Sequence, residues 1–150
     1  MMVNYPDRVS QTWEPEAYGV MPLPSGRLVR GRGLRIDNPY KPAPEFAVYM
    51  VGSDLHGVPW EYRWVDWPDF GLPANPAALR ENLVEALARS SIERVEVGCV
   101  GGRGRTGTAL ACLAVLDGAP AADAVAYVRQ HYSLDAVETM EQASFVVDFR

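Results

Sequence analysis

The feature that most constrains the fold is the stretch of residues 94–107, RVEVGCVGGRGRTG. It opens with valines that alternate with charged residues, a pattern that predicts a short strand. Five glycines follow within the same stretch, and the apolar run over residues 108–116 is rich in strong helix formers. The stretch therefore predicts a strand, a glycine-rich loop and a helix, with Cys99 at the end of the strand and Arg105 at the start of the helix.

This layout suits the binding of an anion. A helix start carries unpaired N–H groups and the positive end of the helix dipole. Glycines let the loop curl so that successive N–H groups converge, and the guanidinium of Arg105 adds a bidentate clamp for two oxygens. The same field favours the thiolate form of a cysteine, which makes Cys99 a candidate nucleophile for attack on a phosphoester. The alternative is a turn that caps a core helix, with Cys99 as a small buried residue.

A second motif, Trp67-Pro68-Asp69, lies upstream of the glycine-rich loop. Prolines on both sides and a nearby glycine predict that Asp69 lies in a loop with stiff ends. Transfer of a phosphoryl group to Cys99 needs an acid that protonates the leaving oxygen. A loop that carries one carboxylic acid supplies this proton and excludes water when it closes. The alternative is that Asp69 only forms an Asx-turn.

At these residues the chain resembles the cysteine-dependent protein tyrosine phosphatase family. Residues 99–107 are similar to the family's phosphate loop, in which a cysteine is followed six positions later by arginine, then by serine or threonine and by glycine. Residues 67–69 are similar to the family's general-acid loop, and the spacing of about thirty residues between acid and cysteine also resembles the family's. The two motifs cover about a tenth of the chain.

The resemblance supports a role for each matching residue. Cys99 attacks phosphorus, Arg105 holds the equatorial oxygens, and Asp69 protonates the leaving oxygen and then accepts a proton from the water that cleaves the phosphocysteine. Thr106 donates a hydrogen bond to the sulfur. Gln142 is a weaker candidate for positioning the water, with a purely structural role as its alternative. The expected phosphate-binding residues are Val100, Gly101, Gly102, Arg103, Gly104 and Arg105.

The substrate class stays open at this stage. The short chain resembles compact dual-specificity and bacterial members, so protein phosphotyrosine is the first expectation and dual specificity the second. Arg103 adds a cation inside the loop, and family members that act on phosphoinositides also carry basic residues there. A lipid or inositol phosphate is therefore an alternative substrate, unless Arg103 only faces solvent.

One departure from the family concerns the residue before the cysteine, which is usually histidine and here is Gly98. Because that histidine helps to orient the loop and activate the thiol, Gly98 raises a second class of function. In this class the protein is a phosphatase-like module that binds phosphorylated partners without turnover. The presence of Cys99, Arg105 and Asp69 favours the enzyme, because a pure binder needs neither a nucleophile nor an acid.

Composition excludes several other classes. The net charge of −5 argues against nucleic-acid binding, and no apolar run approaches the roughly twenty residues of a membrane span. Two cysteines, Cys99 and Cys112, do not indicate a disulfide scaffold, and no signal-peptide pattern is visible, so we expect a cytoplasmic, reducing compartment. We expect no cofactor and no metal. The expected partner is a phosphorylated protein or a small phosphomonoester.

The remaining elements predict an α/β fold with a mostly parallel central sheet of four to five strands and helices on both faces, because strands alternate with helices. We expect one phosphatase-like domain over residues 1–150, with an irregular N-terminal arm at 1–26. An edge strand is expected at 27–35, where the four arginines form a solvated face or, as the alternative, a phosphate-steering patch. The other expected elements are a buried strand at 46–51, a strand at 62–65, a helix from Pro76, a helix at 121–131 with Ala122, Val125 and Ala126 inward, and a last helix after the capping-box residue Thr139.

Overall fold

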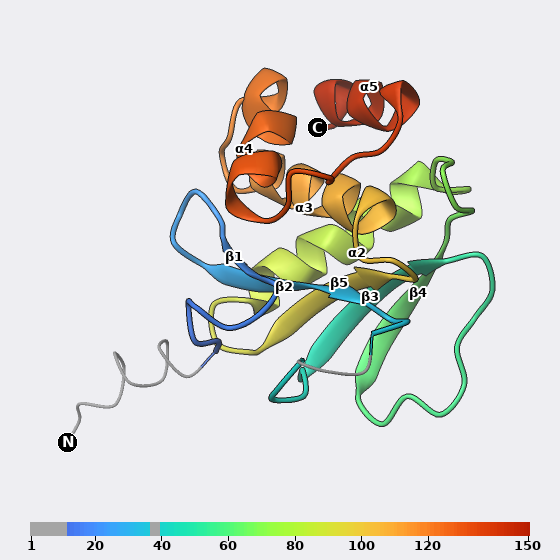
Figure 1. Ribbon diagram of the computed structural model, residues 1–150. Coiled ribbons are helices and arrows are strands. Elements are labelled where there is room, and N and C mark those ends of the chain that lie inside the picture. The colour runs from blue at the N-terminus through green and yellow to red at the C-terminus, as the bar shows by residue number, and fades with distance from the viewer. Residues whose placement is uncertain (1–11, 37–39) are drawn as a thin grey trace.

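The five strands are β1 (Val20–Pro22), β2 (Leu28–Gly33), β3 (Phe46–Val51), β4 (Glu61–Asp66) and β5 (Val95–Cys99). The computed structural model describes residues 12–36 and 40–150, and in it these strands form one sheet with the order β1-β2-β5-β3-β4 (Figure 1). β1 is antiparallel to β2, whereas the other three neighbouring pairs are parallel. The predicted α/β class with a mostly parallel sheet is therefore confirmed.

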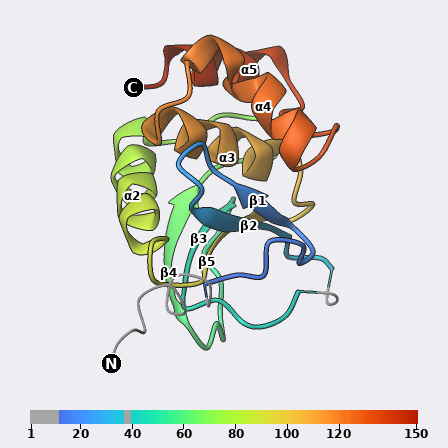
Figure 2. The same ribbon diagram turned by 90° about the vertical axis from the view of Figure 1, so that its left-hand side faces the viewer.

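The described α-helices are α2 (Pro76–Arg89), α3 (Gly104–Leu116), α4 (Ala124–His131) and α5 (Met140–Asp148), and a 3₁₀ turn, η1 (Ala121–Asp123), precedes α4. All four lie on the same side of the sheet (Figures 1 and 2), so the described residues do not show the predicted helices on both faces. The opposite face is covered by non-helical segments, whose Trp13 and Tyr40 pack on Arg30 of β2. None of the described helices is long and apolar enough to cross a membrane.

The side of the sheet that faces the helices is apolar. Alternate residues of β3 (Phe46, Val48 and Met50) and of β5 (Val95 and Val97) join the buried side chains of α2 and α3 in one cluster. Nearly every residue of α3 is buried, because this helix lies between the sheet and the other helices. This burial fixes the N-terminus of α3 against the end of β5.

The opposite side of the sheet carries a buried charged cluster. Glu96 of β5 accepts hydrogen bonds from Arg30 and Arg32 of β2 and from the hydroxyl of Tyr49 on β3. The prediction of an edge strand with a solvated arginine face at 27–35 is therefore wrong, since β2 lies between β1 and β5 and Arg30 is fully buried. The sequence pattern does not reveal this, because the counter-charge, Glu96, lies 66 residues away in the sequence, on a strand that only the fold brings next to β2.

Two further predictions need correction. Residues 1–11 of the predicted irregular arm lie outside the described residues, and within residues 12–26 the chain forms β1, which takes the edge of the sheet next to β2. In the helix predicted at 121–131, Val125 packs half-buried against the core as expected, but Ala122 and Ala126 are exposed, and the buried residues are Ala124 and Val128. The first turn is η1, and its three residues per turn shift the phase of the helical pattern.

Candidate active site

The candidate site lies where β5 ends and α3 begins, and residues 100–103 connect the two. Arg103 occupies the N-cap position of α3 but makes no side-chain capping hydrogen bond, so no cap of its own covers the first N–H groups of the helix. Gly102 has a φ of +76°, and a Cβ there would stand 2.7 Å from the backbone nitrogen of Gly33. Only glycine fits this turn, which leaves the helix start available to an anion.

Cys99 is buried at the base of this loop. Its Sγ accepts hydrogen bonds from the backbone N–H of Gly102 at 3.2 Å and from the Oγ1 of Thr106 at 3.0 Å. Two donors directed at one sulfur suit a thiolate, which accepts hydrogen bonds better than a thiol does. The second cysteine, Cys112, lies in the core of α3, where burial raises the pKa of its thiol far above the ordinary value. Of the two cysteines, only Cys99 has the surroundings of a nucleophile.

Arg105 lies in the first turn of α3 and is 4% exposed. Its Nη1 donates to the carbonyl of Trp67 at 2.9 Å, and its Nη2 lies 3.5 Å from the Oδ1 of Asp69. Its Nε has no hydrogen-bond partner, and it is the one such buried side-chain nitrogen or oxygen within residues 12–36 and 40–150. A buried donor without a partner is costly, so this nitrogen marks a place prepared for an acceptor.

The loop that carries Asp69 is buried where it begins, at Trp67, and exposed at Asp69 and Phe70. Trp67 is fully buried, and its Nε1 donates to the carbonyl of Gly71 at 2.7 Å. Asp69 is 61% exposed at its side chain, and its Oδ1 accepts from the N–H of Phe70 at 3.0 Å. Phe70 adopts a φ of 60° and is exposed, an uncommon conformation for a residue with a side chain. The acid therefore projects from a firmly held turn.

These side chains meet in a cavity of about 340 Å³. Thr106 does not line it, because this residue is fully buried, with its hydroxyl directed at the sulfur of Cys99. Gly102 lines an adjoining cavity of about 230 Å³ instead. The predicted site residues that line the main cavity are Cys99, Arg105, Asp69, Val100, Gly101, Arg103 and Gly104.

Three further residues line this cavity: Arg35, Ile36 and Glu138. Of these, Arg35 belongs to the alternative of a phosphate-steering arginine patch, whereas the sequence predictions do not include Ile36 and Glu138. Arg35 and Ile36 follow the carboxyl end of β2, which is parallel to β5, and the carboxyl ends of parallel strands are where ligands gather. The position of Arg35 and Ile36 at the site therefore follows from the pairing of β2 with β5. Glu138 precedes α5, and no local pattern points to it.

Gln142 does not line the cavity. Its Oε1 accepts from the N–H of Glu138 at 2.9 Å, and its Nε2 donates to the carbonyl of Gly71 at 3.2 Å. The side chain of Thr139 caps α5 by accepting from the N–H of Gln142 at 3.0 Å, as the capping-box pattern predicts. Because Gln142 is fully buried with both side-chain groups engaged, the geometry favours its structural alternative over water positioning.

Gly98 lies beside the ring of Tyr49, its pairing partner on β3. A Cβ on Gly98 would stand 3.2 Å from the ring carbons of Tyr49 and 3.0 Å from the carbonyl of Arg32. Tyr49 is held in place because its hydroxyl donates to Glu96 and accepts from the Nε1 of Trp60. The space that a larger residue before Cys99 would need is therefore filled by a fixed tyrosine.

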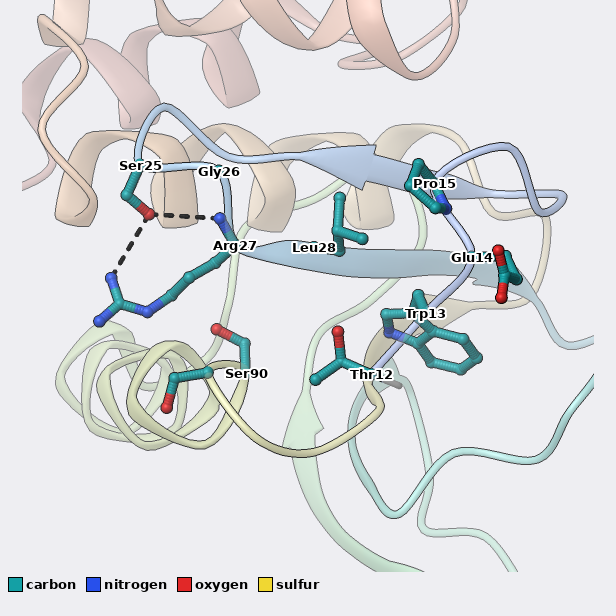
Figure 3. Close-up of a pocket in the computed structure, with 10 residues that line it drawn as sticks. Thr12, Trp13, Glu14, Pro15, Ser25, Gly26, Arg27, Leu28 and Ser90 are labelled. Carbon is teal, nitrogen blue, oxygen red and sulfur yellow. Dashed lines mark hydrogen bonds between the residues drawn. The ribbon is translucent and has the colours of Figure 1, made fainter. Parts of the chain in front are cut away.

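A larger cavity, of about 660 Å³, lies away from the loop (Figure 3). Its lining includes Trp13 and Ser90, and the Oγ of Ser25 accepts from the N–H and the Nη1 of Arg27, both at 3.4 Å. None of its lining residues is a cysteine or a histidine, and its one arginine already has Ser25 and Asp117 as partners. Chemistry therefore points to the smaller cavity around Cys99.

Comparison with known proteins gives a family and a set of structural relatives. The family described as Protein-tyrosine phosphatase matches residues 39–149. Two uncharacterised proteins of Methanocaldococcus jannaschii are each 47% identical to the chain over 60 residues. The matched segment is 40% of this chain and only 36% and 40% of the two relatives, so it spans well under two thirds of their length.

Among solved structures, the chain is similar to Tk-PTP in its active form, with a TM-score of 0.61 and 26% identity over 71% of this chain and 80% of that one. It also shares the fold of the kinase associated phosphatase, with a TM-score of 0.54 and 22% identity over 61% of this chain and 52% of that one. Both similarities extend over more of the chain than the sequence motifs do.

Proposed function

The chain belongs to the protein-tyrosine phosphatase family, and on this premise we propose that it hydrolyses phosphomonoesters, with protein phosphotyrosine as its first substrate class, through a phosphocysteine intermediate. The observation that carries the proposal is the cavity that joins Cys99, Asp69 and the unpartnered Nε of Arg105. A nucleophile, an acid and a free guanidinium donor are the three groups that the reaction needs.

In the first step, the thiolate of Cys99 attacks phosphorus and the bond between phosphorus and the leaving oxygen breaks. Asp69 gives its proton to that oxygen, while the loop N–H groups and Arg105 hold the equatorial oxygens. In the second step, water attacks phosphorus, the P–S bond breaks and phosphate leaves. The hydrogen bond from Thr106 to the Sγ stabilises the thiolate that departs. The family resemblance assigns the proton of this water to Asp69.

The surroundings of Gly98 bear on the alternative of a binding module without turnover. That alternative arose because the family's usual histidine is absent before the cysteine. In this chain the Sγ of Cys99 still has two donors, and the ring of Tyr49 occupies the space beside Gly98. Cys99 therefore keeps two hydrogen bonds to its sulfur without a histidine before it, which supports the enzyme.

The test is hydrolysis of p-nitrophenyl phosphate and of phosphotyrosine and phosphoserine peptides by Cys99→Ser, with Cys112→Ser as the matched control. We expect Cys99→Ser to lose several orders of magnitude in kcat and to keep vanadate binding, because the loop N–H groups and Arg105 remain. We expect Cys112→Ser to retain kcat. Turnover near that of the unchanged protein in Cys99→Ser excludes the phosphocysteine route. Hydrolysis of the phosphotyrosine peptide alone separates tyrosine specificity from dual specificity.

A further inference from the structure

The segment that leads into α5 is held in an unusual conformation beside the cavity. Val137 has a φ of 63°, a region that β-branched residues rarely adopt, and it is buried. The guanidinium of Arg129 holds this backbone, because its Nε donates to the carbonyl of Ala136 at 2.9 Å and its Nη2 to that of Val137 at 2.8 Å. Backbone strain that the surrounding structure enforces is concentrated at functional sites.

The residue after Val137 is Glu138, and its side chain lines the cavity that holds Cys99 and Asp69. The Oε1 of Glu138 occupies the space in which a Cβ on Gly104 would stand, so the carboxylate lies directly against the first residue of α3. A larger residue than glycine at position 104 would displace it. The glycine at position 104 thus leaves room for a second carboxylate in the lining of the cavity.

The backbone of Glu138 is also connected to the acid loop. Its N–H donates to the Oε1 of Gln142, whose Nε2 in turn donates to the carbonyl of Gly71. The same carbonyl accepts from the Nε1 of Trp67. One buried glutamine therefore fixes the segment that carries Glu138 relative to the segment that carries Asp69, and the two carboxylates line a single cavity.

We propose that Glu138 is the general base of the second step, which rests on the proposed phosphatase function: its carboxylate takes the proton of the water that cleaves the phosphocysteine, while Asp69 serves as the acid of the first step. The oxygen of that water bonds to phosphorus as the P–S bond breaks. The electron pair of the broken bond returns to Cys99 as a thiolate, and Glu138 releases its proton to solvent. Two carboxylates in one site with separate acid and base roles are an established division of labour in enzymes.

The experiment measures the two steps separately by rapid mixing with p-nitrophenyl phosphate, whose good leaving group needs little protonation. Release of nitrophenol reports the first step, and the phosphorylated enzyme, quantified by intact mass after acid quenching, reports the second. The variants are Glu138→Gln, Asp69→Asn and the control Glu141→Gln, which changes an exposed carboxylate in the first turn of α5, three residues after Glu138.

We expect Glu138→Gln to give a full burst of nitrophenol, to accumulate phosphorylated enzyme and to break it down more slowly by on the order of 10²-fold. The pH dependence of the breakdown rate should disappear in this variant, which a merely structural role would not produce. Asp69→Asn and Glu141→Gln should break the intermediate down at the rate of the unchanged protein.

Two results overturn the assignment and leave the proposed function standing. One is breakdown at the unchanged rate in Glu138→Gln with accumulation in Asp69→Asn, which makes Asp69 the base of both steps. The other is faster formation of the intermediate in Glu138→Gln without slower breakdown, which makes Glu138 only a repulsive charge. Absence of phosphorylated enzyme and of turnover in the unchanged protein overturns the phosphatase function itself, and the assignment with it.

Discussion

Arg30 and Arg105 are both buried, but the hydrogen bonds around them differ. The Nε and Nη2 of Arg30 donate to the Oε1 of Glu96 at 2.8 and 2.6 Å, its Nη1 donates to the carbonyl of Pro42 at 2.8 Å, and the ring of Trp13 covers its guanidinium. Within residues 12–36 and 40–150, Arg105 has no carboxylate closer than that of Asp69 at 3.5 Å, and its Nε has no partner. Every nitrogen of the Arg30 guanidinium is engaged within the fold, whereas Arg105 lines a cavity and keeps one nitrogen available to a ligand.

The charged cluster around Arg30 joins neighbouring strands, but its burial also has a cost in free energy. Burial lowers the pKa of Arg30 from its ordinary value, against the opposing influence of Glu96. Removal of charges from water offsets much of what a buried ion pair gains, so such a cluster adds little net stability while intact. Loss of one partner is different, because it leaves a charge buried without compensation. Arg105 differs because its nearest carboxylate among the described residues, that of Asp69, lies 3.5 Å away and is largely exposed, and this contrast leads to three predictions.

The largest effect is expected from Glu96→Gln, which leaves Arg30 and Arg32 without their shared carboxylate. The free energy of unfolding should fall by about 3–5 kcal/mol. Urea denaturation followed by tryptophan fluorescence measures this value. Variants that remain folded should retain most of their kcat, because Glu96 does not line the cavity. A loss of less than about 1 kcal/mol in the free energy of unfolding would show that the charged cluster around Arg30 does not hold the fold together.

A loss of at least about tenfold in kcat/KM is expected for Arg105→Lys, which keeps the charge but loses the planar fork. This corresponds to roughly 1.5–3 kcal/mol, the worth of one hydrogen bond to a charged group. The free energy of unfolding should change by less than it does in Arg30→Lys, which disrupts the bonds to Glu96. Initial-rate kinetics and denaturation of the two variants, measured side by side, test the contrast. The contrast between the two arginines is contradicted if folded Arg30→Lys loses more kcat/KM than folded Arg105→Lys.

The same contrast explains which parts of the molecule could be predicted from sequence. Cys99, Arg105 and the strand–loop–helix around them are local in the chain, so glycines, alternation and helix formers indicate them directly. The bond between Arg30 and Glu96 joins residues that are 66 positions apart, and it depends on which strands are neighbours. Without that knowledge, the arginines of β2 look like a solvated face.

Glu138 eluded sequence reasoning for a related reason. Its place in the cavity depends on the left-handed conformation of Val137 and on the way the start of α5 packs beside α3. The capping-box pattern correctly predicts the hydrogen bond from the N–H of Gln142 to Thr139, whereas the side chain of Gln142 accepts from the N–H of Glu138 rather than from that of Thr139. Local rules found the cap of the helix, but only the tertiary structure shows that the residue before the cap enters the site.

The smallest effect concerns a tyrosine in each region, Tyr49 in the charged cluster and Tyr132 beside the phosphate loop, where its hydroxyl donates to the carbonyl of Gly102 at 2.6 Å. Burial raises the pKa of both phenols above the ordinary value of 10.0. The folded state therefore favours the neutral phenol, whereas the unfolded chain begins to ionise near pH 10.

Their contribution to stability is complete below that pH and declines as the pH rises above it, by about 1.4 kcal/mol per pH unit for each group. Tyr49→Phe and Tyr132→Phe should each reduce the slope of unfolding free energy against pH above about 10, and the double variant should reduce it by the sum. A residual slope is expected because burial also raises the pKa of Tyr40. Only Tyr132→Phe should lower kcat/KM as well, since its hydroxyl alone holds a loop carbonyl. Denaturation at several pH values, together with kinetics at neutral pH, measures both properties.

Two results would contradict the contrast between the charged cluster and the active-site cavity. One is the same slope of unfolding free energy against pH in the two variants and in the unchanged protein. The other is an equal loss of kcat/KM in Tyr49→Phe and Tyr132→Phe.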